Sequence, residues 1–190
     1  MNLKNLVLHH DDRSTDFLKS IYAGLPAVTV VSDSSDQNVS QLIREHDRVI
    51  MLGHGYPGGL FFMVNDSHAS LLRQKRDNLY IWCHADQYVK HHGLTGLTTG
   101  MFISETGEAM YSGIPAKTYS QSTVTYSNEL FARLLAEKIH APLPELHTHL
   151  LDRYQPKGCP IIEYNRERLE LIESAAASAK RSRSAALLTA

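Results

Sequence analysis

Residues 48–55 (RVIMLGHG) and 78–83 (NLYIWC) decide the fold of this chain. Each segment is an apolar run of strand length, and each ends in a chemically capable side chain, His54 in the first and Cys83 in the second. Neither run alternates apolar with polar residues, which indicates strands that are buried on both faces. The stretch between them is long enough for a loop, a helix and a return strand, as in a βαβ unit.

Similar apolar runs and amphipathic stretches alternate on both sides of these two segments. Further strands are expected at residues 3–8, 27–31 and 98–104, and helices near residues 14–23, 38–46, 66–76 and 84–92. Ser14 or Thr15 is the expected cap of the first helix. This alternation is typical of an α/β fold of three αβα layers around a mainly parallel central sheet.

The C-terminal half has a less regular pattern. Helices are expected at residues 127–140 and 145–154, a late strand at 159–164 and a last helix at 166–177. We expect one domain over residues 1–178, which fits the length of 190 residues. Residues 179–190 are rich in Ala, Ser and Arg and are expected to form a flexible tail.

Composition narrows the class of protein. Lys and Arg total 19 and Asp and Glu total 20, so the net charge of −1 gives no basic surface for nucleic acid or for an anionic membrane. No apolar run is long enough to span a bilayer, and the first residues do not resemble a signal peptide. With only two cysteines a disulfide framework is not expected, and the sequence favours a cytoplasmic location.

His54 and Cys83 are suited to nucleophilic catalysis. The carboxyl ends of neighbouring parallel strands meet at one edge of a sheet, so both side chains are expected in one crevice there. His54 could take the thiol proton of Cys83, and a helix starting just after Cys83 would favour the thiolate. The backbone amides of Gly55 and Cys83 could then stabilise an oxyanion, which is the arrangement that acyl transfer requires.

An apolar strand that ends in His-Gly, followed by a second apolar strand that ends in Cys, resembles the caspase-like cysteine peptidases, a group with gingipain, clostripain, legumain and separase branches. The resemblance implies a caspase-like fold, with His54 as general acid/base, Cys83 as nucleophile and the Gly55 and Cys83 amides as oxyanion hole. It also implies a peptide or protein substrate and no cofactor. The chain departs from the family in having Trp82 before the cysteine and His84 after it, where many members have small residues.

Other interpretations of these residues remain open. Trp82 could pack beneath the nucleophile or fill the substrate pocket, and in the second case the chain would be a non-catalytic binding or regulatory domain of the same fold. A metal-dependent hydrolase could instead use His9, His10, Asp11 and His54, although no established metal-ligand spacing occurs. Asp86 and Glu105 follow strands near the proposed cleft, and with Trp82 they could form a pocket for a basic substrate side chain. Cys159 is expected to have a packing role only.

Overall fold

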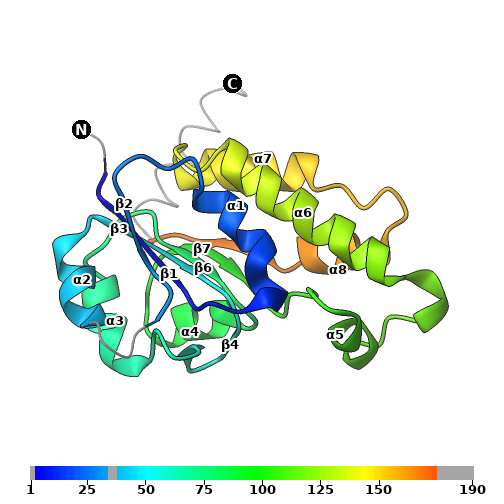
Figure 1. Cartoon of the computed structure of the whole chain (residues 1–190), viewed down its shortest axis with the longest axis horizontal. Helices are drawn as coiled ribbons and strands as arrows, with labels where there is room; N and C mark the ends of the chain where they lie inside the picture. The colour runs from blue at the N-terminus through cyan, green and yellow to red at the C-terminus, as the bar shows by residue number, and fades with distance from the viewer. Residues whose placement is uncertain (1–2, 34–37, 175–190) are drawn as a thin grey trace, which may run out of the picture.

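A computed structural model describes residues 3–33 and 38–174 (Figure 1). Its centre is a six-stranded sheet with the strand order β2-β1-β3-β6-β7-β8. The first five of these strands are parallel, and β8 runs antiparallel to β7. The strands are β1 (Asn5–His9), β2 (Val28–Val31), β3 (Arg48–Leu52), β6 (Leu79–Ile81), β7 (Gly96–Thr99) and β8 (Leu169–Ile172); β4 (Gly55–Tyr56) and β5 (Gly59–Leu60) form a separate hairpin.

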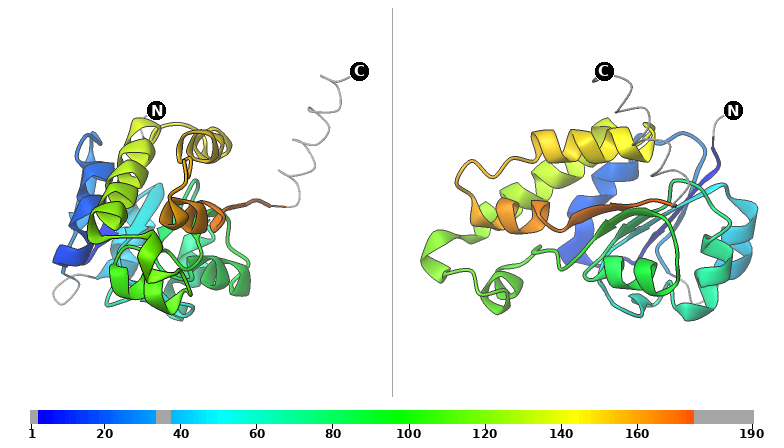
Figure 2. Two further views of the ribbon diagram at one scale, coloured as in Figure 1. Left: turned by 90° about the vertical axis from the view of Figure 1, so that its right-hand side faces the viewer. Right: turned by 180° about the vertical axis from the view of Figure 1, so that it is seen from behind.

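Helices cover both faces of the sheet, which gives the three layers expected from the sequence (Figures 1 and 2). The 3₁₀ helix η1 (Arg13–Leu18), α1 (Lys19–Tyr22), α6 (Gln121–Glu137), α7 (Leu143–Arg153) and α8 (Pro160–Arg166) contribute to the core on one face. On the other face lie α2 (Val39–Glu45), α3 (Ala69–Leu72) and α4 (Ala85–His91), the second of which follows the short η2 (Asp66–His68). The fold is therefore α/β with a mainly parallel sheet between two helical layers.

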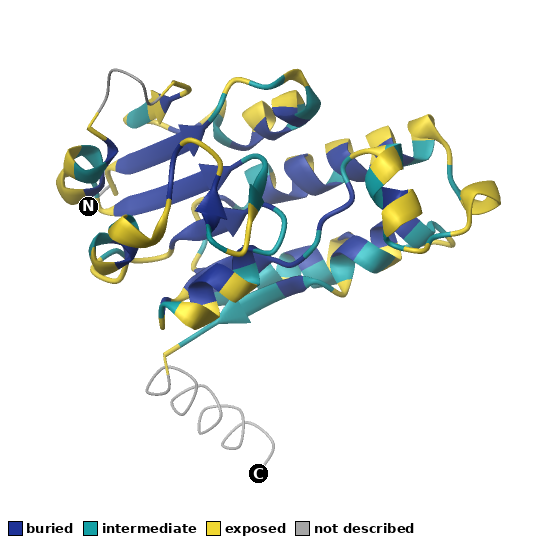
Figure 3. Ribbon diagram, turned by 90° about the horizontal axis from the view of Figure 1, so that it is seen from below, coloured by how far each residue is buried: buried dark blue, intermediate teal, exposed yellow. Residues whose placement is uncertain are grey.

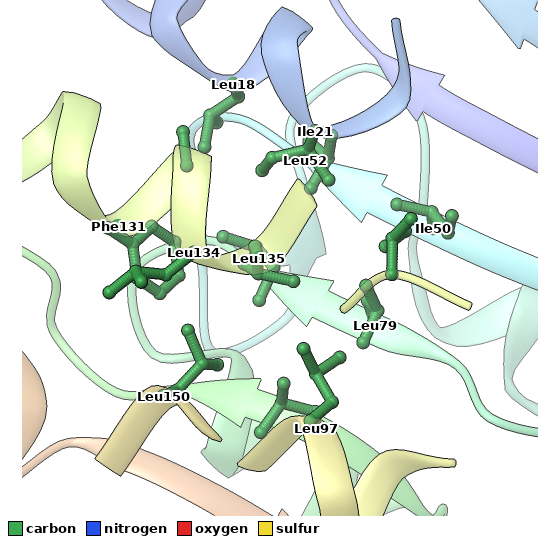
Figure 4. Close-up of a cluster of buried hydrophobic side chains, with 14 of the residues drawn as sticks. Leu18, Ile21, Ile50, Leu52, Leu79, Leu97, Phe131, Leu134, Leu135 and Leu150 are labelled. Carbon is green, nitrogen blue, oxygen red and sulfur yellow. The ribbon is translucent and has the colours of Figure 1, made fainter. Parts of the chain in front are cut away.

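The central strands are apolar throughout because successive side chains enter different cores. In β3, Ile50 and Leu52 pack under α1 and α6 (Figure 4). Val49 and Met51 belong to the other core, with residues of α2 and α3. All five residues of β3 are buried, and the central strands of the sheet are dark blue in Figure 3, whereas the edge strand β8 is mostly of intermediate burial. Two-sided burial explains why these segments show no polar alternation.

Two of the predictions for the C-terminal region are wrong. The expected strand at 159–164 is the helix α8, because Pro160 occupies the first turn, where its missing N–H costs no hydrogen bond. The expected last helix at 166–177 begins with the end of α8 and continues as β8, whose backbone pairs with β7 from Gly96 to Thr99. Residues 175–177 of that expected helix and the expected tail at 179–190 lie outside the described residues.

The fifth strand is displaced from the expected position. Residues 98–104 were expected to form it, but β7 ends at Thr99, and the chain then leaves the sheet. Asn165 of α8 replaces the missing strand partner, because its side chain accepts from the N–H of Ile103 at 2.7 Å and donates to the carbonyl of Ile103 at 3.0 Å. The backbone of this buried loop is thereby satisfied without a sheet partner.

A small lobe extends beyond the carboxyl edge of the sheet. It contains α5 (Thr106–Tyr111) and η3 (Ala116–Thr118), and it projects away from the sheet in Figures 1 and 2. A minor core of Ile103, Ala109, Val124 and Ile161 attaches the lobe to α6 and α8. Among the described residues, no helix combines the length and the apolar character that crossing a membrane requires.

Candidate functional site

A pocket lies at the carboxyl ends of β3 and β6, and both His54 and Cys83 line it. These strands are neighbours in the sheet, with Leu52 paired to Ile81, so each of the two side chains comes two residues after the last residue pair. The other lining residues come from η1, from the strand ends and from the loop after β7: Thr15, Phe17, Leu18, Gly53, Ile81, Trp82, Phe102 and Ser104. The structure therefore brings the sequence-predicted pair into one pocket.

The position of His54 is set by a sharp change of direction after β3. Gly53 has φ = +135°, a conformation in which a side chain would be strained, and its N–H donates to the carbonyl of Ile81 at 3.1 Å. The carbonyl of His54 accepts from the N–H of Phe61 at 3.0 Å, which ties this residue to the β4–β5 hairpin. The backbone on both sides of the imidazole is thus fixed.

The imidazole of His54 has a polar partner in the loop after β1. Nε2 of His54 lies 2.6 Å from Oγ of Ser14, and that hydroxyl lies 2.7 Å from Oδ1 of Asp12. The same carboxylate oxygen accepts from the backbone N–H of Ser14 at 2.8 Å. These hydrogen bonds from Ser14 lower the pKa of Asp12.

Sequence reasoning missed this arrangement. Ser14 was expected only as a helix cap, whereas Asp12 is the residue that caps η1. The Asp-x-Ser spacing directly after a buried strand is the signal that could have found it, because Asp side chains commonly accept from the backbone two residues on.

The thiol of Cys83 contacts groups other than the His54 imidazole. Its Sγ lies 3.5 Å from the carbonyl oxygen of Phe102 and 3.8 Å from Oε1 of Glu108. Burial, and next the Glu108 carboxylate, raise the pKa of Cys83 to about 11. No hydrogen bond joins the His54 ring to the thiol within residues 3–33 and 38–174. Cys83 is therefore a protonated thiol at neutral pH in this conformation.

The helix after Cys83 does not stabilise a thiolate as expected. The helix α4 begins at Ala85 and has only seven residues. His84 precedes it in the left-handed region, with φ = 66°. A residue with a Cβ is uncommon in this conformation, which glycine adopts at little cost. Burial and the Glu108 carboxylate therefore outweigh any effect of the helix dipole on the thiol.

The backbone N–H groups of Gly55 and Cys83, which were predicted to form the oxyanion hole, do not donate to a neighbouring strand that the structure describes. The pair Gly55–Leu60 is not hydrogen-bonded, because the bond from Phe61 N–H to the His54 carbonyl lies one position away, so the N–H of Gly55 points away from β5. The N–H of Cys83 has no hydrogen-bond partner within the described part of the chain. Cys83 therefore lines the pocket with an N–H that has no backbone partner among the described residues, whereas Gly55 follows the pocket-lining His54 and does not line the pocket itself.

Trp82 packs beneath the hairpin. Its side chain is 1 % exposed and belongs to the core on the α4 side, and its Nε1 donates to the carbonyl of Tyr56 at 3.2 Å. A Cβ on Gly55 would lie 2.3 Å from Cδ1 of Trp82 and 2.6 Å from the carbonyl oxygen of Gly59. Glycine at position 55 is therefore what lets the hairpin approach the indole so closely.

A second cavity of about 460 Å³ adjoins the pocket and shares Phe17 and Ser104 with it. Glu105 lines this cavity, as do Glu129, Arg13 and Asn128. Asp86, which was predicted beside Glu105, lines neither of the two cavities and lies 3.4 Å from the ammonium of Lys90 on α4. The three predicted pocket residues thus separate: Trp82 lines the first pocket, Glu105 lines the second cavity, and Asp86 lies on α4 with its Oδ1 buried outside both cavities.

The four residues of the metal hypothesis point to different partners. Both ring nitrogens of His9 are engaged, Nδ1 at 3.1 Å from the Tyr22 hydroxyl and Nε2 at 3.1 Å from the Thr15 hydroxyl. His10 packs its ring against Phe62, and Asp11 pairs with Lys19 at 3.1 Å. Within the described ranges, no group of three or more His, Cys, Asp or Glu side chains is arranged to hold a metal ion.

Comparison of the chain with models of known protein families found no match, and comparison with curated proteins found none either.

The buried His9 makes stability depend on pH. Burial, and next the charge of Lys19, lower the pKa of His9 from 6.5 to about 4. Above pH 6.5 the imidazole is neutral in both states, and as the pH falls toward 4 the unfolded chain binds a proton that the folded chain does not. We expect the free energy of unfolding to fall by up to about 3 kcal/mol over this range from His9 alone.

Urea unfolding at several pH values between 7 and 4 measures this effect. His9→Gln is expected to flatten the dependence, while the exposed His91→Gln keeps the wild-type slope. Equal slopes in wild type and His9→Gln would contradict the assignment of His9 as a neutral core residue.

Removing the charge of Glu108 is expected to make Cys83 more reactive. Glu108→Gln keeps an oxygen for the amides of Ser104 and Glu105 but removes the carboxylate that lies 3.8 Å from Sγ. Because each pKa unit changes the thiolate fraction tenfold, we expect alkylation by iodoacetamide at pH 8 to be several-fold to about tenfold faster.

Peptide mass spectrometry of alkylated Cys83 provides the rate. Glu129→Gln is the matched control, since it removes a carboxylate that lines the second cavity and makes no contact with the thiol. The role assigned to Glu108 is wrong if Glu108→Gln reacts no faster than this control.

Proposed function

We propose that the chain is a cysteine-dependent peptide-bond hydrolase, with Cys83 as nucleophile and His54 as general acid/base. The observation that carries the proposal is the common pocket: both side chains follow the paired ends of β3 and β6 by two residues and line one pocket. A strand end with an imidazole beside a strand end with a thiol supplies both groups that acyl transfer by cysteine needs.

In the proposed reaction, Sγ forms a bond to the substrate carbonyl carbon as the thiol proton passes to the imidazole of His54. The carbonyl oxygen carries the developing charge, and the amides of Gly55 and Cys83 donate to it. The carbon–nitrogen bond then breaks, and His54 returns the proton to the leaving amine. Water attacks the resulting thioester, His54 takes a proton from that water, and the thiol is restored as the acid product leaves.

The conformation described above is a resting one in this proposal. The thiol contacts Phe102 and Glu108, so it must turn about its Cα–Cβ bond to face His54. The first contact comes from the loop after β7, and the second comes from α5, which belongs to the small lobe. We expect substrate binding to displace Glu108 from the thiol, which would remove one of the two causes of the raised pKa.

The second cavity is the proposed position of a substrate side chain next to the scissile bond. Glu105 and Glu129 face it with one opposing cation, Arg13, and the buried Oδ1 of Asn128 has no partner within the described residues. This lining favours a group rich in hydrogen-bond donors, such as the ammonium of lysine or the guanidinium of arginine.

Membership of the caspase-like group is part of the proposal. It is supported by the layered α/β fold with a mainly parallel sheet and by the two strand ends that carry His54 and Cys83. Both cysteines are free, and a reducing compartment such as the cytosol would keep the nucleophile in the thiol form.

One observation favours a second candidate function, a non-catalytic binding domain of the same fold. Burial and Glu108 raise the pKa of Cys83 to about 11, so the thiol is far less ionised at neutral pH than an ordinary cysteine. If Glu108 never leaves, the same pocket and second cavity would bind a peptide without cleaving it.

Hydrolysis of a fluorogenic peptide library separates the two functions. We expect the wild-type protein to cleave peptides, with a basic residue preferred before the scissile bond. Cys83→Ala and His54→Ala are each expected to lower kcat/KM by about 10³-fold or more, because each removes a member of the reacting pair.

Cys159→Ala is the control, since Cys159 only packs against two apolar clusters and should keep near-wild-type activity. Cleavage that persists in Cys83→Ala, or an intact wild-type protein that binds peptides and cleaves none, would overturn the hydrolase proposal.

A further inference from the structure

The loop after β1 presents an ordered pair of side chains behind His54. Oδ1 of Asp12 accepts from Oγ of Ser14 at 2.7 Å, and Oγ of Ser14 is 2.6 Å from Nε2 of His54. The three groups form a continuous chain from a carboxylate to the imidazole that lines the pocket with Cys83. The reaction described above uses His54 alone and assigns nothing to Asp12 or Ser14.

The direction of the hydrogen bonds in this chain follows from the chemistry of the groups. An ionised carboxylate can only accept, so the single hydroxyl proton of Ser14 is donated to Asp12. The hydroxyl oxygen can then only accept from His54, which requires that Nε2 carries a proton. A neutral imidazole has one N–H, and Nδ1 of His54 is consequently the free base.

We infer that Asp12 and Ser14 are positioning residues that hold His54 in the Nε2–H tautomer, so that Nδ1 is the nitrogen that exchanges protons with Cys83. The inference deepens the proposed function and rests on it for the role of Cys83. When His54 becomes an imidazolium during the reaction, the negative charge of Asp12 stabilises it through the Ser14 hydroxyl. The lowered pKa of Asp12 agrees with a carboxylate that stays ionised.

The loop that carries the two residues is anchored in the core. The hydroxyl of Thr15 donates to the carbonyl of Asp12 at 3.0 Å, and the backbone N–H of Thr15 donates to the same oxygen at 3.0 Å. The Thr15 hydroxyl in turn lies 3.1 Å from Nε2 of the buried His9. Because the backbone of Asp12 is fixed in this way, its carboxylate has little freedom to leave Ser14.

A purely structural role must be distinguished from positioning. Asp12 caps η1 through the backbone N–H of Ser14, so changing it can destabilise the fold without any effect on the chemistry of His54. Ser14 offers the cleaner test, because the bond from its backbone N–H to Asp12 survives the loss of the hydroxyl. The tautomer of His54 is the property that a cap alone would not control.

Nitrogen-15 NMR of the histidine rings measures the tautomer directly. Spectra are recorded at about pH 8.5, well above the ordinary pKa of histidine. The chain has 11 histidines, so the signals of His54 are assigned by their loss in His54→Gln. We expect His54 to be in the Nε2–H form in the wild-type protein, to become a mixture of tautomers in Ser14→Ala, and to return to the Nε2–H form in Ser14→Thr.

Ser20→Ala is the matched control, since the Ser20 hydroxyl donates to the carbonyl of Phe17 and makes no contact with His54. The positioning role of Asp12 and Ser14 is overturned if wild-type His54 carries its proton on Nδ1. It is also overturned if His54 has the same tautomer in Ser14→Ala as in Ser20→Ala.

Hydrolysis supplies the second measurement. With peptide substrate, we expect kcat/KM to fall by about 10- to 100-fold in Ser14→Ala, as for other losses of catalytic positioning, and to recover in Ser14→Thr. An equal loss in both variants would overturn the positioning role. The NMR measurement needs no substrate. If the protein shows the expected tautomers but no hydrolysis, the result contradicts the proposed function and not the positioning of His54 by Asp12 and Ser14.

Discussion

The parallel pairing of β3 with β6 is the interaction on which the rest of the site depends. It sets Leu52 beside Ile81, and both strands end at the same edge of the sheet. His54 and Cys83 each follow this last pair by two residues and line the same pocket. Both strands are buried by helices on each face, and a slip of one residue would exchange the side chains of the two cores. The same burial that stabilises the fold therefore fixes the place of the imidazole and the thiol.

The groups around His54 and those around Cys83 favour opposite kinds of charge state, a cation at His54 and a neutral group at Cys83. Behind His54, the loop after β1 supplies a hydroxyl and a carboxylate, which would stabilise the imidazolium of the proposed reaction. Behind Cys83, the carbonyl of Phe102 and the carboxylate of Glu108 suit a neutral thiol. The proposed base thus has a hydroxyl and a carboxylate behind it, while the proposed nucleophile is held as a neutral thiol by Glu108, a residue of the small lobe.

Much of the fold could be predicted from sequence, because burial on both faces leaves a clear mark. The runs at 48–52 and 79–81 contain almost only apolar residues and form central strands. The prediction was wrong in the C-terminal region because CPIIEY and LELI are short apolar runs that fit a helix or a strand equally well. Pro160 favours a helix in the first run, and pairing with the edge of β7 makes the second run a strand. The His54 and Cys83 positions followed from strand ends. The contacts of Ser14 with His54 and of Glu108 with Cys83 did not, since each joins two segments that are far apart in the sequence.

The most direct test of the central claim is a crystal structure of the protein after a peptidyl halomethyl ketone has reacted with it. We expect the inhibitor methylene on Sγ of Cys83, Glu108 displaced, and Nδ1 of His54 within roughly hydrogen-bond reach, about 3 to 4 Å, of the sulfur or of the inhibitor's ketone oxygen. An adduct on Cys83 with His54 still turned away from it and beyond contact would contradict the account, as would labelling of Cys159 in preference to Cys83.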